Sequence, residues 1–135
     1  MLALAVAYEI QCRFTAVVPV MAKGFNHAIQ LAISAAAGAG KLFGLTDEQI
    51  AHAISIATVD NISLTCVHVE PVSQWKGFSP GMTGMRAVYS ASLAKRGFTG
   101  PSGLLRVQTV CCGCSTRRST LTGQTTLLRS SRVRS

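Results

Sequence analysis

Charged residues are scarce in this chain, and acidic residues are the scarcest of them. Only 13% of its 135 residues are charged and five are Asp or Glu, whereas 48% are hydrophobic. A chain of this length and composition can bury a substantial apolar core. We therefore expect a folded domain rather than an intrinsically disordered protein.

Long uninterrupted apolar runs are also missing. Glu9 and Arg13 interrupt the apolar run at the N-terminus, and Gln30 and Lys41 interrupt the run over 28–45. Neither run reaches the length of about 20 apolar residues that a membrane-spanning helix needs. Because no basic residue precedes the apolar start, the pattern of a secretory signal peptide is absent as well. We expect no membrane partner and a cytoplasmic location, with the mitochondrion as the alternative in a eukaryote.

The cysteine and histidine residues do not form a metal-binding pattern. The five cysteines are odd in number and lack the spacing of a disulfide framework, so free thiols in a reducing compartment are expected. Cys111 and Cys114 have a Cys-x-x-Cys spacing, but no second pair or nearby histidine completes a zinc site. His52 and His68 are not accompanied by further acids or histidines at ligand spacing, and we interpret both as structural. The sequence predicts no metal site.

The basic charge is concentrated at the C-terminal end. The net charge is +8, and six arginines without any acidic residue follow Gly103, which leaves 1–103 nearly neutral. At the same position Ser, Thr and Arg replace the alanine-rich pattern. We expect a domain over 1–103 and, over 104–135, a basic tail that is disordered or translated in a shifted reading frame. Because this tail has no interleaved aromatic residues, a nucleic-acid binder is the least favoured hypothesis and no nucleic-acid partner is expected.

Apolar residues before Gly103 recur with a helical period, which predicts an all-α fold that is part of a helical bundle. A first helix runs to about Phe14, and a second runs from near His27 to Gly44. The second helix has small or apolar residues on every side and is expected to be the buried central helix. The apolar stripe of the first helix consists of Leu2, Val6, Ile10 and Phe14.

Capping signals place two further helices. Thr46 and Gln49 form the capping-box pattern that starts a third helix. Ser79 as N-cap with Pro80 at the first helical position predicts the start of a fourth helix, which Gly97 ends. The stretch 58–78 is then predicted to be a loop, and a loop of about twenty residues in a compact domain is usually functional.

Five short segments, in order and at matching spacing, resemble the helical domain of the MmgE/PrpD family, which includes 2-methylcitrate dehydratase and cis-aconitate decarboxylase. The resemblance covers roughly 3–103. The pattern of 76–77 followed by 85–88 favours the dehydratase branch. The five segments are Ala7-Tyr8-Glu9-Ile10-Gln11, Lys23-Gly24-Phe25-Asn26-His27, Gly44-Leu45 after the alanine-rich helix, Trp75-Lys76-Gly77 and Gly97-Phe98-Thr99-Gly100-Pro101.

The resemblance implies a cofactor-free lyase that acts on a small tricarboxylic acid, as a homodimer in the full-length family. It assigns His27 as an acid–base or carboxylate-binding group and Lys76 as a carboxylate anchor, with Arg86 as a weaker candidate for a carboxylate contact. These residue types suit the reaction, because three carboxylates need cationic partners and loss of water needs one group to take a proton and another to protonate the leaving hydroxyl. His27 suits either proton-transfer role near neutral pH.

The resemblance also implies parts that this sequence does not contain. In the family, an acidic residue and further histidines of the active site precede the matched region, and a second, smaller domain follows it. We therefore expect an internal fragment of a lyase, inactive by itself, and leave open whether the chain alone is an enzyme. The alternatives are a cis-aconitate decarboxylase-like fragment and a non-catalytic helical piece that associates with itself or with a longer relative.

Overall fold

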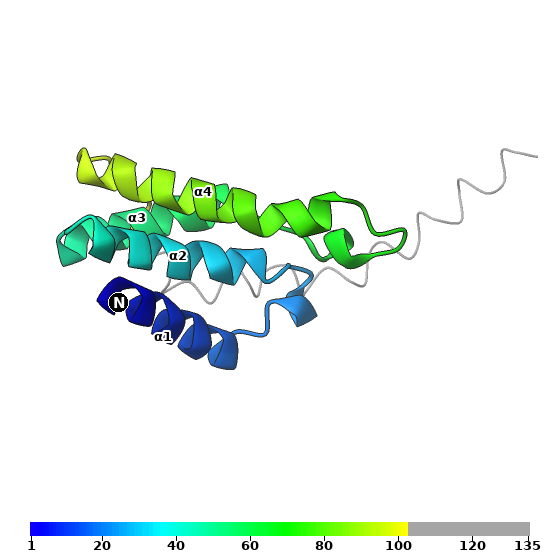
Figure 1. Ribbon diagram of the computed structural model, residues 1–135. Helices are drawn as coiled ribbons and strands as arrows, with labels where there is room; N and C mark the ends of the chain where they lie inside the picture. The colour runs from blue at the N-terminus through cyan, green and yellow to red at the C-terminus, as the bar shows by residue number, and fades with distance from the viewer. Residues whose placement is uncertain (103–135) are drawn as a thin grey trace, which may run out of the picture. The chain divides into compact units, whose positions relative to one another are not determined.

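Four α-helices make up most of residues 1–102, the part of the chain that the computed structural model describes (Figure 1). They are α1 (Leu2–Val17), α2 (Ala28–Leu42), α3 (Asp47–Asp60) and α4 (Trp75–Lys95), joined in part by the short 3-10 turns η1 (Met21–Lys23) and η2 (Thr65–His68). This region contains no β-strand, which confirms the all-α prediction, and none of its helices is long and apolar enough to cross a membrane. The expected tail over 104–135 lies outside the described residues, and so do its three cysteines.

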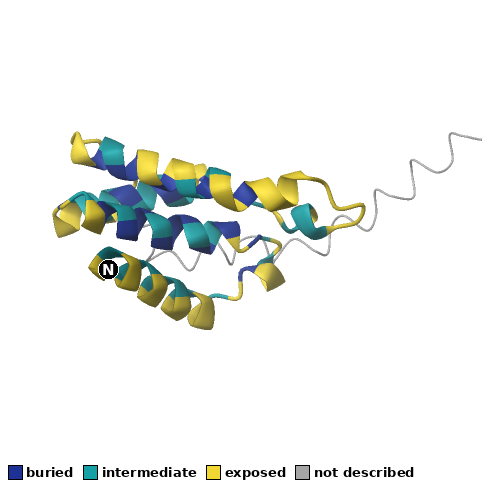
Figure 2. Cartoon of the chain, viewed as in Figure 1, coloured by how far each residue is buried: buried dark blue, intermediate teal, exposed yellow. Residues whose placement is uncertain are grey.

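Helix α2 is the centre of this fold. It packs against α1, α3 and α4, and α3 also packs against α4. Figure 2 shows the buried residues gathered on α2 and on the inward faces of α3 and α4, whereas α1 has no buried residue. The prediction of a buried central helix is therefore confirmed. The core consists almost wholly of small side chains: Ala32, Ala36, Ala57 and Ala87 form one cluster, and Leu45, Ala53, Ala91 and Ala94 form another.

Small residues let the helices approach closely. A Cβ atom built on Gly40 of α2 would lie 2.9 Å from Cγ1 of Ile50 in α3, a distance that real Cβ atoms do not show. Close packing of this kind stabilises the contact between the helices, because any gap between side chains forfeits dispersion energy. Glycine at this position is thus part of the α2–α3 interface.

The ends of α1, α2 and α3 are set by residues next to them in the sequence. Thr46 Oγ1 accepts a hydrogen bond from the Gln49 amide at 3.3 Å and Gln49 Oε1 accepts one from the Thr46 amide at 3.1 Å, which confirms the predicted capping box. Helix α2 ends at Leu42, and Gly44 adopts a φ of 68° that reverses the chain. Helix α1 continues beyond Phe14 to Val17, because nothing in the sequence stops it before the residue that precedes Pro19.

The predicted start of the fourth helix is wrong. Helix α4 begins at Trp75, so Ser79 is not its N-cap and Pro80 lies inside it. The first turn forms earlier because the amides of Lys76 and Gly77 donate to the carbonyls of Ser73 and Gln74 at 3.2 and 3.1 Å. Since Pro80 lacks an N–H group, it forfeits only the bond to the carbonyl of the exposed Lys76. As a result Lys76 belongs to the first turn of a helix, and the preceding loop is shorter than expected.

This loop is tied to the start of α2. The Asn26 amide donates to the Ser63 carbonyl at 2.8 Å, and the Thr65 amide donates to the Gly24 carbonyl at 3.0 Å. Phe25 and Leu64 thereby form an isolated antiparallel bridge. The bridge places η2 beside the N-terminus of α2, although the two segments are far apart in sequence.

Candidate functional site

The N-terminal ends of α2 and α4 border a pocket of about 360 Å³. Residues from α1, α2, η2 and α4 line it, together with the two residues that precede α2. The lining residues are Gln11, Asn26, His27, Ala28, Leu31, His68, Lys76, Ser79 and Pro80. The structure therefore brings His27 and Lys76, both singled out in the sequence, into one pocket.

His27 directly precedes α2 and its side chain is exposed. Its Nδ1 lies 3.4 Å from Oε1 of the buried Gln30, whose Nε2 donates to the Val18 carbonyl at 3.1 Å. Since the Gln30 amide uses its N–H group on Val18, its oxygen faces His27, and Nδ1 of the imidazole must be the donor. This arrangement leaves Nε2 of the neutral His27 ring as an acceptor.

Lys76 lies on the first turn of α4 and is exposed. The ion pair found in residues 1–102 joins Arg13 to Glu9, so Lys76 has no carboxylate partner among the described residues. An unpaired ammonium group on a flexible stem is suited to an anionic ligand that enters from solvent.

His68, which was interpreted from the sequence as structural, also lines this pocket. It is half-buried in η2, and its Nε2 lies 2.7 Å from Nδ2 of the buried Asn26. The sequence signal was the long loop, which was expected to be functional, but no local pattern indicated that His68 faces the start of α2. Its placement depends on the bridge between Phe25 and Leu64.

Two other singled-out residues lie elsewhere. Arg86 is not among the pocket residues, and its guanidinium donates to the carbonyl of Asp60, the last residue of α3, at 3.3 Å. His52 Nδ1 accepts a hydrogen bond from the Gly100 amide at 3.3 Å, which agrees with its interpretation as structural.

The chemistry of the pocket favours an anion. Among the described residues, its lining contains two histidines and one lysine but no Asp or Glu. Two helix N-termini also border it, and the dipole of a helix favours negative charge at its N-terminus. Within 1–102, no group of three His, Cys, Asp or Glu side chains could hold a metal ion.

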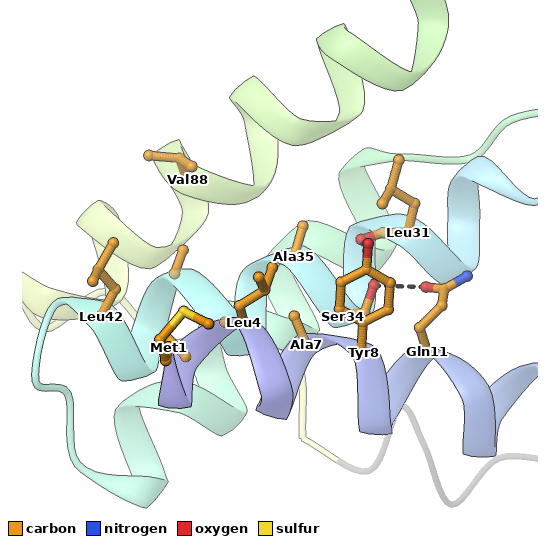
Figure 3. A pocket seen from close by; sticks show the side chains of 13 residues that line it. Met1, Leu4, Ala7, Tyr8, Gln11, Leu31, Ser34, Ala35, Leu42 and Val88 are labelled. Atoms are coloured by element: carbon orange, nitrogen blue, oxygen red, sulfur yellow. Dashed lines mark hydrogen bonds between the residues drawn. The ribbon is translucent and has the colours of Figure 1, made fainter.

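A second, larger pocket of about 580 Å³ has a different character (Figure 3). Residues of α1 and α2 line most of it, and Val88 of α4 borders one side. Its lining is mainly aliphatic, with Tyr8, Gln11 and Ser34 as the polar members, and Ser34 Oγ donates to Gln11 Oε1 at 2.6 Å. Among the described residues, no Lys, Arg or His side chain lines it.

Comparison with known families agrees with the resemblance drawn from the sequence. The MmgE/PrpD N-terminal domain matches residues 1–120, which is most of the chain and extends past the expected domain boundary at residue 103. A search of curated proteins found no match. The all-helical fold over 1–102 and the family match together lead to one conclusion: the chain belongs to the MmgE/PrpD family.

Proposed function

We propose that the pocket between α2 and α4 binds a small tricarboxylic acid, as part of the active site of a lyase resembling 2-methylcitrate dehydratase. The observation that carries this proposal is the meeting of His27, Lys76 and His68 around one pocket without an acidic residue. Family membership supports tricarboxylic acids as the substrate class. The sequence pattern over 76–77 and 85–88 favours the dehydratase over the cis-aconitate decarboxylase branch.

The geometry supports a role for each of two residues. Lys76 pairs with one carboxylate of the ligand, because it has no carboxylate partner among the described residues and its stem is flexible. His27 offers Nε2 as the acceptor for a proton next to a carboxylate, since Gln30 occupies its Nδ1. Both side chains are exposed, so water reaches the ligand from the open side of the pocket.

Binding without turnover is the expected behaviour of the isolated chain. Elimination of water needs a base and an acid on opposing sides of the substrate and exclusion of solvent. The described residues of the pocket form only one side of such a site and include no carboxyl group. We therefore assign the chain a binding role by itself and a catalytic role only with groups contributed from elsewhere.

Calorimetric titration of the purified chain tests the proposal. The ligands are 2-methylcitrate, cis-aconitate and the unreactive propane-1,2,3-tricarboxylate, with sulfate as the control for a general anion site. Saturable binding of the tricarboxylates, and weaker binding of sulfate, is expected. Equal affinity for all four would indicate an unspecific anion site, and tighter binding of cis-aconitate than of 2-methylcitrate would favour the decarboxylase-like alternative.

A specific surface feature favours a second candidate function, association with another copy of this chain. Met85 and Tyr89 are 58% and 64% exposed, and their spacing places them on one face of α4. Trp75 and Phe78, whose rings are 6.0 Å apart, are also exposed near the start of this helix. Large exposed apolar groups of this kind mark interaction surfaces, and the family resemblance implies a homodimer.

A further inference from the structure

We propose that His68 is a third ligand-binding residue of this pocket, and that Asn26 holds it in the tautomer that presents Nδ1–H to an oxygen of the bound acid. The inference rests on the proposed function of the same pocket and adds a residue to it. In this arrangement His27 and His68 present opposite groups to the ligand: His27 an acceptor nitrogen, His68 a donor.

Asn26 is fixed by hydrogen bonds of its backbone and of its side chain. Its backbone amide donates to the Ser63 carbonyl at 2.8 Å, and its side-chain Oδ1 accepts from the Ala28 amide at 2.9 Å. Only 8% of Asn26 is exposed, so water does not replace these partners. Because Oδ1 is held by a backbone N–H group, which can only donate, the orientation of the side-chain amide is determined.

This orientation of the Asn26 amide determines which ring nitrogen of His68 carries the proton. The group that faces His68 is the Nδ2 amide of Asn26, which has donors only, and it lies 2.7 Å from Nε2. Nε2 must therefore accept, and the single proton of the neutral ring is on Nδ1. No hydrogen bond of Nδ1 is formed with residues 1–102, and His68 lines the pocket.

His52 shows what a structural histidine looks like in the same chain. Its Nδ1 is used as the acceptor for the Gly100 amide, and it does not line the pocket. In His68 the engaged nitrogen is instead Nε2, which accepts from Nδ2 of the buried Asn26. Oδ1 of the same asparagine accepts from the Ala28 amide at the start of α2. The pair of Asn26 and His68 thus couples the loop to the start of α2, and leaves the Nδ1–H group of His68 without a partner among residues 1–102. We assign Asn26 as a positioning residue, because it acts through His68.

The tautomers give a direct first test. The chain contains three histidines, so nitrogen NMR spectra of the labelled protein resolve each ring. We expect the Nδ1–H tautomer for His27 and His68 and the Nε2–H tautomer for His52. An Nε2–H tautomer at His68 would overturn the inference whether or not the chain binds a tricarboxylate.

A double-mutant cycle tests the role in binding, with propane-1,2,3-tricarboxylate as the titrated ligand. The His68→Ala variant is expected to bind about tenfold more weakly, the effect of losing one hydrogen bond to a charged group. Asn26→Ser keeps an oxygen for the Ala28 amide but removes the Nδ2 donor, and is expected to weaken binding as well. In the His68→Ala background the serine substitution should have no further effect, because the Nδ2 group that it removes acts only through His68.

Two more variants separate binding from folding. His68→Asn keeps an N–H donor near the position of Nδ1 and is expected to restore part of the affinity. His52→Ala is the matched control and should leave affinity unchanged. Additive effects of the Asn26 and His68 substitutions, or unchanged affinity in His68→Ala while His27→Ala and Lys76→Ala bind more weakly, would refute the role of His68 and leave the proposed function intact. A wild-type chain that binds no tricarboxylate would overturn the proposed function itself, and the binding role of His68 with it.

Discussion

Gly38 of α2 lies directly against Ala7 of α1. A Cβ atom built on Gly38 would be 2.9 Å from the Cβ of Ala7 and 3.1 Å from the carbonyl oxygen of Ala3. Neither neighbour can rotate away, because one is a methyl group on the helix and the other is backbone. Since α1 has no buried residue and packs mainly against α2, this contact sets how closely α1 lies on the rest of the fold.

The Gly38→Ala substitution is therefore expected to destabilise the chain. Overpacking of a tight interface costs about 1–3 kcal/mol, against a gain of at most about 1 kcal/mol from the higher helix propensity of alanine. The midpoint of thermal unfolding should fall by about 4–8 °C for each kcal/mol of net loss. Gly84→Ala in α4 is the control, because no atom lies within 4 Å of its Cβ position, and it should raise stability slightly. Equal stabilisation by both substitutions would show that α1 is not held at this distance.

Lys76→Ala is expected to weaken tricarboxylate binding by about twofold to fivefold, the range for an exposed charge pair. The loss should shrink as salt is added, because exposed charges are screened. Titration calorimetry at low and high ionic strength measures both effects. Lys41→Ala, which changes an exposed lysine outside the pocket, should bind like the wild type. If both lysine variants lose the same affinity, the effect comes from net charge and not from the pocket.

Arg86→Ala should leave tricarboxylate affinity unchanged. The guanidinium of Arg86 donates to the carbonyl of Asp60 at 3.3 Å and does not line the pocket. The expected consequence is a small loss of stability at the end of α3, seen as a lower midpoint of thermal unfolding. Weaker binding in a folded Arg86→Ala variant would instead restore Arg86 as a carboxylate contact.

The purified chain should neither dehydrate 2-methylcitrate nor decarboxylate cis-aconitate at a measurable rate. Loss of a single aligned proton-transfer group commonly removes a factor of about 10² to 10⁴, and this pocket has an open side and no carboxyl group. Product formation followed over hours checks the expectation. Turnover that disappears in the His27→Ala variant would show that the residues of this pocket suffice for catalysis.

Self-association should depend on the exposed face of α4. Replacing Met85 and Tyr89 with lysine adds charge to that face, and is expected to reduce any oligomer because buried unpaired charges oppose association. Sedimentation velocity over a wide range of protein concentration measures the effect. Replacing Glu48 and Ala51, two exposed residues of α3, with lysine adds charge at another helix and serves as the control. Oligomers that persist in the α4 variant would place the interface elsewhere.

Much of the fold was predictable from local patterns in the sequence. The stripe that contains Ile10 and Phe14 predicted α1, and the capping box of Thr46 and Gln49 located the start of α3. These predictions succeeded because helix periodicity and capping depend on residues a few positions apart. The same local reasoning failed at Pro80, since the carbonyls of Ser73 and Gln74 start the first turn of α4 before the proline is reached.

The sequence by itself determined the helices and, through its small residues, the central place of α2. Only the tertiary structure decided that His68 shares a pocket with His27 and Lys76. Asn26 and His68 are 42 positions apart, and they meet because the strand-like bridge of Phe25 with Leu64 lays the loop across the start of α2. Such a contact depends on backbone hydrogen bonds between distant segments, which can form between many pairs of residues and leave no periodic or capping pattern in the sequence.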